Sequence, residues 1–221
     1  MCIRDSSAGY HIYTSIDPDV QKQLQSSVDN ALSGYTEKDK NGIYKTQASG
    51  TCIDNDTGKV VAIVGGREQK NIGYTLNRAF QSPRQPGSAI KPLLVYAPAL
   101  EHGWSAGSTV NDSPMSTKDK NRVRNSHGSY SGQISLRRAV QKSSNVATMR
   151  IYEQLTPKTC LKYLEEMNFK YLTDSDYKYY TTCIGGFTKG TTSEEMAAGY
   201  ATLKNDGVYR DCLLYTSDAA D

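Results

Sequence analysis

The segment SGTCIDNDTGKVVAIVGG, residues 49–66, constrains the fold more strongly than any other stretch of the chain. Its two runs of strand-forming residues meet at Asn55-Asp56-Thr57-Gly58, which favours a tight turn, so the segment predicts a β-hairpin. YHIYTSI, residues 10–16, alternates well enough to predict another strand. Most of the remaining patterns are helical. Strands towards the extremes and helices in the middle predict an α+β fold with an antiparallel sheet, and not alternating βαβ units.

Several helices are marked by start and stop signals. Asp17-Pro18 provides a helix cap and a proline at the first helical position, and Gly34 ends this helix. Its apolar face is formed by residues four apart, namely Val20, Leu24, Val28 and Leu32. Other helices are expected at 135–143, at 146–155, from Thr156-Pro157 onwards, and from the capping box Thr192-x-x-Glu195 to Asp206-Gly207.

A further helix follows the motif RQPGSAIKP, residues 84–92. Its buried face is expected to contain Ile90, Leu93, Leu94 and Ala97. Pro98 should kink this helix or end it early. Residues 103–133 are rich in Gly, Ser, Asn and Asp, so we expect one long loop that borders a cleft and becomes ordered when a substrate binds.

Composition argues against several classes of function. The net charge is only +3, and the densest basic patch, Lys118 to Arg124, is interrupted by acids and asparagines, so we expect no nucleic-acid partner. Cys52, Cys160 and Cys183 are odd in number and lack CxxC spacing, which predicts neither a zinc site nor a disulfide framework. Small buried thiols are the simpler interpretation. No phosphate-binding motif occurs, and we expect no metal and no cofactor.

The two ends need separate treatment. Residues 1–6, MCIRDS, and residues 212–221, CLLYTSDAAD, look like translations of the transposon-end adapter used in shotgun sequencing libraries. We expect both segments to be adapter-derived and exclude them from the fold. Residues 7–211 are then one partial domain of a longer protein. No internal apolar run reaches the roughly 20 residues that span a bilayer.

Ser88 and Lys91 carry the chemistry that the sequence suggests. If Ser88 lies in the first turn of a helix, Lys91 lies on the same face, within reach of it. A serine hydroxyl needs a base, and a lysine can serve if burial lowers its pKa towards neutrality. Free N–H groups at the start of the helix would stabilise a developing oxyanion. S-x-x-K alone also fits an ordinary serine cap, so the wider context decides.

That context resembles the penicillin-binding proteins. NRAFQSPRQPGSAIKPLLVYAPALEHG, residues 77–103, resembles the active-site segment of these transpeptidases, and its Arg-Gln-Pro-Gly lead-in looks most like the bifunctional, class A members. IDPDVQKQLQ, DNDTGKVVAIVGG and IGGFTKGTTSEEMAAGYATLKNDGVY are similar to other parts of the same domain. The resemblance covers nearly all of residues 9–210. It implies the fold shared by penicillin-binding proteins and serine β-lactamases, incomplete at its C-terminal side.

The resemblance also assigns the site residues. The second family motif, S-x-N, matches Ser143, Ser144 and Asn145 between two predicted helices. Ser143 would relay protons, and Asn145 would bind the substrate peptide and hold Lys91. A plain helix cap would explain these residues equally well in isolation. The third motif, K-T-G, is absent; TKGTT, residues 188–192, has similar letters in the wrong order. We expect the K-T-G strand to follow Asp211 in the natural protein.

The resemblance implies a peptidoglycan D,D-transpeptidase in which Ser88 is acylated by D-Ala-D-Ala stem peptides or by β-lactams. The parent protein would act at the extracytoplasmic face of the bacterial plasma membrane, anchored by an N-terminal helix. Its partners would be stem peptides, the lipid-linked precursor and other cell-wall synthesis proteins. This chain, without K-T-G, is expected to be inactive.

Three alternatives remain open. A serine β-lactamase would need a deacylating base and would lack the Arg-Gln-Pro-Gly lead-in. A β-lactam sensor would be recognised by membrane segments in the parent gene. An inactive scaffold domain would be expected to lose Ser88 or Lys91, and both are present.

Overall fold

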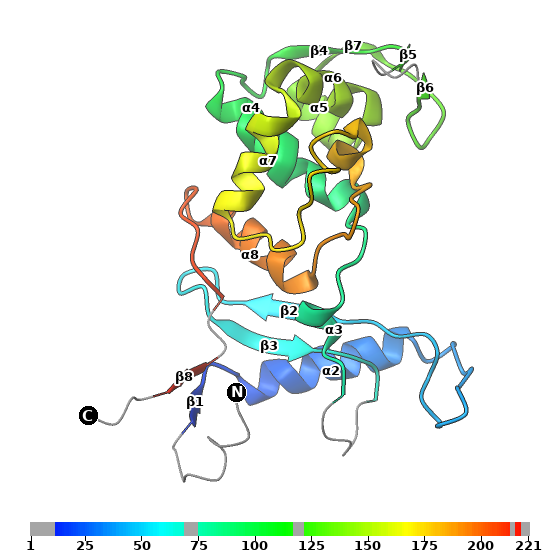
Figure 1. The fold of residues 1–221 in the computed structure, drawn as a ribbon, viewed down its shortest axis with the longest axis vertical. Helices are drawn as coiled ribbons and strands as arrows, with labels where there is room; N and C mark the ends of the chain where they lie inside the picture. The colour runs from blue at the N-terminus through cyan, green and yellow to red at the C-terminus, as the bar shows by residue number, and fades with distance from the viewer. Residues whose placement is uncertain (1–11, 69–74, 117–121, 213–214, 218–221) are drawn as a thin grey trace.

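The structure is a computed structural model that describes residues 12–68, 75–116, 122–212 and 215–217. Figure 1 shows a lower layer, built on the hairpin of β2 (Gly50–Ile53) and β3 (Val60–Val64), beneath an upper body of helices. Helix α2 (Pro18–Ala31) packs against β3, and α8 (Ser193–Lys204) lies between β2 and the upper body. β1 (Ile12–Thr14) pairs antiparallel with β8 (Tyr215–Ser217). Helices and antiparallel strand pairs agree with the predicted α+β class.

The hairpin of the lower layer confirms the prediction for residues 49–66. β2 and β3 pair antiparallel from Gly50↔Val64 to Ile53↔Val60, with a register shift between Cys52 and Ile53. The turn closes with Gly58 at a φ of +74°, a conformation that glycine adopts without strain. Asp17 caps α2 as predicted, since its side chain accepts from the backbone N–H groups of residues 19 and 20.

The two outer edges of this hairpin differ. On the β3 side the Gln21 amide donates to the Ile63 carbonyl at 3.0 Å and accepts from the Ile63 N–H at 2.8 Å. The Asp17 N–H also bonds to the Val61 carbonyl. Beyond its ladder to β3, the backbone of β2 has no hydrogen bond to any residue that the structure describes. The β3 edge is therefore covered, and the β2 edge can accept another strand.

The motif helix forms the centre of the upper body, although it is less regular than predicted. It begins as the 3₁₀ turn η1 (Gly87–Ile90), continues as the π-helical segment η2 (Pro92–Tyr96) and ends as α4 (Ala97–Glu101). The prediction that Pro98 would end this helix early was wrong, whereas the turn before Pro98 does depart from α-helical geometry. The wide π turn, in which the Ala97 N–H bonds to the Pro92 carbonyl, leaves room for the Pro98 ring, and the helix continues to Glu101.

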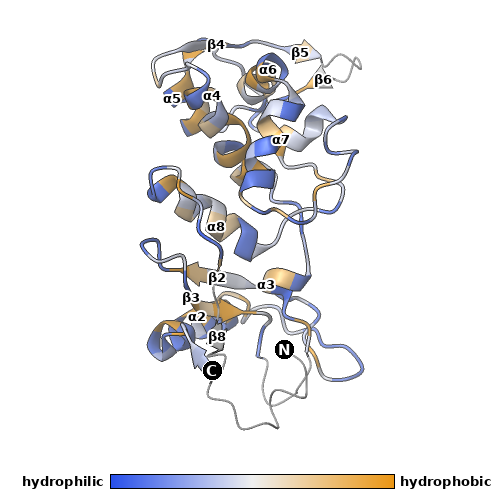
Figure 2. Ribbon diagram, turned by 60° about the vertical axis from the view of Figure 1, so that its left-hand side comes forward, coloured by the Kyte–Doolittle hydropathy of each residue, from blue (hydrophilic) through white to orange (hydrophobic). Residues whose placement is uncertain are grey.

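The other helices of the upper body surround this one and supply its core. They are α5 (Leu136–Gln141), α6 (Asn145–Leu155), α7 (Pro157–Glu166) and the 3₁₀ turn η3 (Tyr180–Ile184). Leu93, Leu94 and Val95 are fully buried among them, whereas Ala97 is only half-buried. Figure 2 shows hydrophobic residues in β3 and in the inner helices. The predicted helices are present, with α8 ending at Lys204 rather than at Asp206-Gly207; η3 was not predicted.

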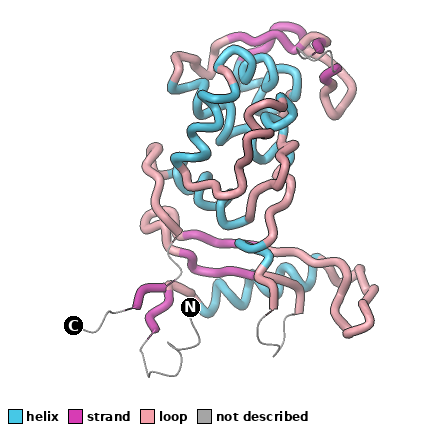
Figure 3. Tube along the Cα trace, viewed as in Figure 1, coloured by secondary structure: helices cyan, strands magenta, loops and turns pink. Residues whose placement is uncertain are grey.

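The prediction of one long loop at residues 103–133 was wrong. Figure 3 shows strands above the helices as well as in the lower layer. β4 (Thr109–Asp112) pairs with β7 (Gly132–Ser135), and β5 (Met115–Ser116) pairs with β6 (Arg122–Val123). We call residues 109–135 the ribbon; residues 117–121 lie outside the described part. Its strands escaped detection because buried Asp112 occupies a position where a strand pattern would show an apolar residue.

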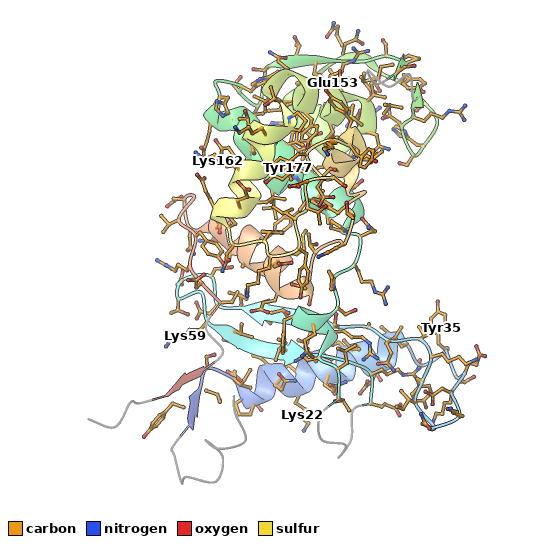
Figure 4. All side chains as sticks on the ribbon, viewed as in Figure 1. Lys22, Tyr35, Lys59, Glu153, Lys162 and Tyr177 are labelled. Carbon is orange, nitrogen blue, oxygen red and sulfur yellow. The ribbon has the colours of Figure 1, made fainter. Side chains whose placement is uncertain are left out.

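The loop between α7 and η3 is tied down by buried polar groups. Asp176 is 1% exposed, and its carboxylate accepts from the N–H and hydroxyl groups of both Thr173 and Thr188. Tyr177, labelled in Figure 4, donates from its hydroxyl to Glu165 of α7. Thr188 belongs to TKGTT, so part of that stretch serves this loop.

Residues 84–87, the lead-in to the motif helix, are held by the chain that follows η3. The Gln85 amide makes a reciprocal pair with the backbone of Phe187, and Arg84 forms an antiparallel bridge with Thr191. Gly185, at a φ of +95°, packs directly on the backbone of Gly87. These contacts explain physically why an Arg-Gln-Pro-Gly sequence precedes the serine.

Replacement of Gly185 by alanine should destabilise the domain strongly. A Cβ atom there would lie 2.3 Å from the Cα and carbonyl oxygen of Gly87, and backbone cannot easily move away. Gly103→Ala is the matched control, because its φ is +88° but nothing lies within 4 Å of the added Cβ. Both variants should lose about 1–2 kcal/mol from left-handed backbone strain, and Gly185→Ala should lose a further 1–3 kcal/mol, roughly, from overpacking. Urea unfolding measures the difference, and equal losses would contradict the close packing.

Candidate active site

Ser88 and Lys91 lie on one turn of helix but in different environments. Ser88 belongs to η1 and is exposed, whereas Lys91 directly follows η1 and is 1% exposed. The Lys91 N–H bonds to the Ser88 carbonyl, so the two residues share a tight helical turn. Within the described residues, the Ser88 hydroxyl makes no hydrogen bond. The turn thus joins an accessible hydroxyl to an amine that points into the protein.

Three oxygen acceptors surround the amine of Lys91. Its Nζ lies 2.7 Å from the Ser143 carbonyl, 3.2 Å from Ser143 Oγ and 2.7 Å from Asn145 Oδ1. An ammonium group has three protons to donate, so the site satisfies all of them. The structure therefore brings Lys91 of S-x-x-K together with Ser143 and Asn145 of S-x-N, an arrangement that the family resemblance implied for Asn145.

Burial changes the acid–base properties of Lys91. Because the charged form loses water, the pKa of its amine falls from 10.5 to about 8. Cys183 of η3 acts in the opposite direction, but burial raises the pKa of that thiol, so the thiol is neutral in this range. Cys183 lies 3.6 Å from the Met149 sulfur, and both side chains are buried in the core. An amine with a pKa near 8 can accept a proton at neutral pH, which an ordinary lysine does poorly.

Ser143 occupies a strained position between α5 and α6. Its φ is +47°, a left-handed conformation that non-glycine residues seldom adopt. The turn is closed by bonds from the Ser143 N–H to the Val140 carbonyl and from the Ser144 N–H to the Ala139 carbonyl. In this conformation both the carbonyl and the hydroxyl of Ser143 reach Lys91. Such strain persists only where the surrounding structure holds it.

Asn145 is the first residue of α6, and both ends of its amide are engaged. Oδ1 accepts from Lys91, and Nδ2 donates to the Arg124 carbonyl at 2.9 Å. The middle serine of the motif, Ser144, caps α6 by accepting from the Ala147 N–H at 2.9 Å. The plain helix-cap interpretation therefore describes Ser144, while Ser143 and Asn145 contact the lysine.

Sequence reasoning missed a buried polar cluster behind this turn, formed by Asp112, Asn125 and Ser144. All three are at most 3% exposed. Asp112 and Asn125 lie in the stretch that was expected to be a loop. The one signal for them in the sequence was the high asparagine and aspartate content of that stretch. Turns and loops have the same composition, so this signal does not distinguish a buried polar cluster from a loop.

One large cavity lies away from these residues. It measures about 770 Å³ and is lined by α8, β3 and the segments around Lys170 and Tyr209. Neither Ser88 nor Lys91 borders it.

In the part of the chain that the structure describes, no group of histidine, cysteine or acidic side chains could hold a metal ion. Cys160 and Cys183 are buried and unpaired as expected, but Cys52 is only half-buried. No described helix is both long and apolar enough to cross a bilayer.

A comparison with protein families identifies the class to which this site belongs. The family model described as the penicillin binding protein transpeptidase domain matches residues 48–220. The chain belongs to this family. It is 35% identical over 231 residues to penicillin-binding protein 1A of Clostridium perfringens, covering 96% of the chain and 34% of that relative. It is 34% identical over 202 residues to penicillin-binding protein 4 of Bacillus subtilis, covering 91% and 30% respectively. The chain spans about a third of the length of these relatives.

Solved structures show the same fold. The structure of PonA1 from Mycobacterium tuberculosis in complex with penicillin V superimposes with a TM-score of 0.75 at 22% identity, covering 99% of the chain and 58% of PonA1. Penicillin-binding protein 1A from Haemophilus influenzae gives a TM-score of 0.77 at 20% identity, covering 96% and 45%. The predicted fold is thereby confirmed. The 1A-type relatives confirm the resemblance to class A members.

The pKa of Lys91 in the folded protein should lie far below the value that a lysine has in an unfolded chain. Because burial disfavours its charged form, the Cε resonance of ¹³C-labelled Lys91 should shift with a midpoint of about pH 8. The variant Lys91→Arg assigns the signal by removing it. A Lys91 midpoint near 10.5 would show that the amine is hydrated and contradict the buried site.

Proposed function

We propose that this chain is the acyl-transfer part of a peptidoglycan D,D-transpeptidase, with Ser88 as the nucleophile and Lys91 as its base. One observation carries the proposal: an amine with a lowered pKa, held by Ser143 and Asn145, lies one turn from an exposed serine hydroxyl. Membership of the transpeptidase family supports the same chemistry. The exposed hydroxyl suits a peptide substrate that approaches from solvent.

The reaction would proceed through an acyl-enzyme. The neutral amine of Lys91 takes the proton of the Ser88 hydroxyl as its oxygen attacks the carbonyl carbon between two D-alanines. The peptide bond breaks, and D-alanine leaves with a proton that Ser143 can relay, because its hydroxyl lies 3.2 Å from Lys91 Nζ. An amine of a neighbouring stem peptide then attacks the ester, forms the cross-link and returns the proton to the lysine–serine pair. A β-lactam would acylate Ser88 through the same first step.

The site of action and the partners follow from this chemistry. Peptidoglycan is assembled outside the cytoplasm, so the whole protein would act at the outer face of the bacterial plasma membrane. We propose that an N-terminal helix of the parent protein anchors it there. Stem peptides and the lipid-linked precursor would be its substrates, and other cell-wall synthesis proteins would be its partners.

The first test is covalent labelling by a fluorescent penicillin. The gene that carries this chain is recovered by reading outward from both ends, and its domain is expressed with the K-T-G segment. Wild-type protein and the control Ser82→Ala should carry the label, whereas Ser88→Ala should carry none. A well-folded wild-type domain that takes up no label would favour an inactive scaffold. Label that is lost quickly by hydrolysis would favour a serine β-lactamase.

The 221-residue chain by itself should be acylated slowly. We propose that a K-T-G strand supplies a second oxyanion donor, and loss of one such donor costs roughly 10²–10³-fold in rate. The unpaired edge of β2 supports the view that further strands join this sheet. The label should therefore appear on the chain at least about 100-fold more slowly than on the domain with K-T-G. Equal rates, with circular dichroism showing both proteins folded, would refute this prediction.

A further inference from the structure

We infer that Asn125 and Asp112 of the ribbon are positioning residues for the lysine base. Their hydrogen bonds hold the S-x-N turn so that the amide of Asn145 presents its oxygen, and not its nitrogen, to Lys91. The inference rests on the proposed function, because it concerns the base that activates Ser88. It assigns a role in catalysis to a part of the chain that contains neither sequence motif.

The side-chain amide of Asn125 has a fixed orientation. Its Nδ2 donates to Asp112 Oδ1 at 2.8 Å and to the Ser129 carbonyl at 3.0 Å. Both partners are acceptors, so the amide nitrogen must face them and the amide oxygen must face the opposite way. That oxygen accepts from the N–H groups of Asn145 at 2.9 Å and Val146 at 3.2 Å. Asn125 thus binds the first backbone groups of α6.

Asp112 fixes this arrangement. It is fully buried, and no described ion pair involves it. Its Oδ1 also accepts from the Ser144 hydroxyl at 2.6 Å, and its Oδ2 accepts from the Ser131 N–H at 3.0 Å. A buried carboxylate is costly unless its oxygens are satisfied, and these bonds satisfy both. The Asp112 carboxylate therefore links Asn125 and Ser131 of the ribbon to Ser144, the middle residue of the S-x-N motif.

The orientation of Asn145 depends on that of Asn125. Because Asn125 holds the Asn145 backbone, the Asn145 side chain lies against the residue that precedes Asn125. Its Nδ2 donates to the Arg124 carbonyl at 2.9 Å, and a carbonyl can only accept. Asn145 Oδ1 is then left to face Lys91 Nζ at 2.7 Å. If the amide were reversed, its NH₂ group would meet the ammonium group, two donors with no acceptor between them.

Two variants of Asn125 separate positioning from stability. Asn125→Ala removes the oxygen that holds α6, and the rate constant for acylation of the folded enzyme by a fluorescent penicillin should fall about 10- to 100-fold. Asn125→Asp keeps an oxygen for α6 but loses the donor to Asp112 and places two carboxyl groups together. It should therefore acylate within a few fold of wild type, while its unfolding midpoint falls by at least about 4 °C.

The matched control is Asn111→Ala, which makes the same change one residue from Asp112. The Asn111 side chain accepts only from the Ser113 N–H and has no link to the S-x-N turn. Its acylation rate should equal that of wild type. All proteins are the K-T-G-containing domain described above, and rates are normalised to the folded fraction.

The outcomes are distinguishable. If wild type is not labelled at Ser88, the proposed function fails and this inference falls with it. If wild type is labelled and Asn125→Ala acylates like Asn111→Ala, only the positioning role is refuted. If Asn125→Asp is as slow as Asn125→Ala, so that rate simply follows stability, the positioning role is refuted as well.

Discussion

The hydrogen bonding of one buried amine governs the arrangement of the upper body. Lys91 is almost completely enclosed, and a buried charge is tolerated only where its protons find acceptors. All three acceptors come from a single turn, Ser143 to Asn145, which is held in a strained conformation. The three acceptors stay near Lys91 only if α5 and α6, which flank this turn, are held in fixed positions. The ribbon holds the start of α6 through Asp112 and Asn125. Much of the polar structure of this half of the molecule serves to keep three oxygens near one nitrogen.

The motif helix connects this interior to the surface. Ser88 is exposed while Leu93 and Leu94, within two turns of it, are fully buried. A helix end that passes from solvent to core so abruptly needs support at its start. The Gln85 pair with Phe187 and the close packing of Gly87 on Gly185 provide it. Ser88, the proposed nucleophile, is thus positioned by the contacts of the residues that precede it, since its own side chain makes no hydrogen bond to any described residue.

Features with local causes could be predicted from the sequence, and features with distant causes could not. The hairpin turn at Gly58 and the caps at Asp17 and Thr192 depend on neighbouring residues, and each was found as predicted. The ribbon was missed because its buried positions include polar residues whose partners lie up to 32 residues away, as in the Ser144–Asp112 bond. The π-helical segment was not predicted as such, although Pro98, whose ring its wide turn accommodates, had marked this part of the helix as irregular. The contact of Ser143 and Asn145 with Lys91 was anticipated only because the chain resembles a known family.

The span of chain that builds the lysine pocket is short compared with the domain. The groups that contact Lys91, the polar cluster behind them and the partners of the lead-in all lie between Arg84 and Thr191. A ribosome that has reached Thr191 has already made every one of them. Because a domain generally folds as a unit, these groups, although made early, are expected to come together with the rest of the domain.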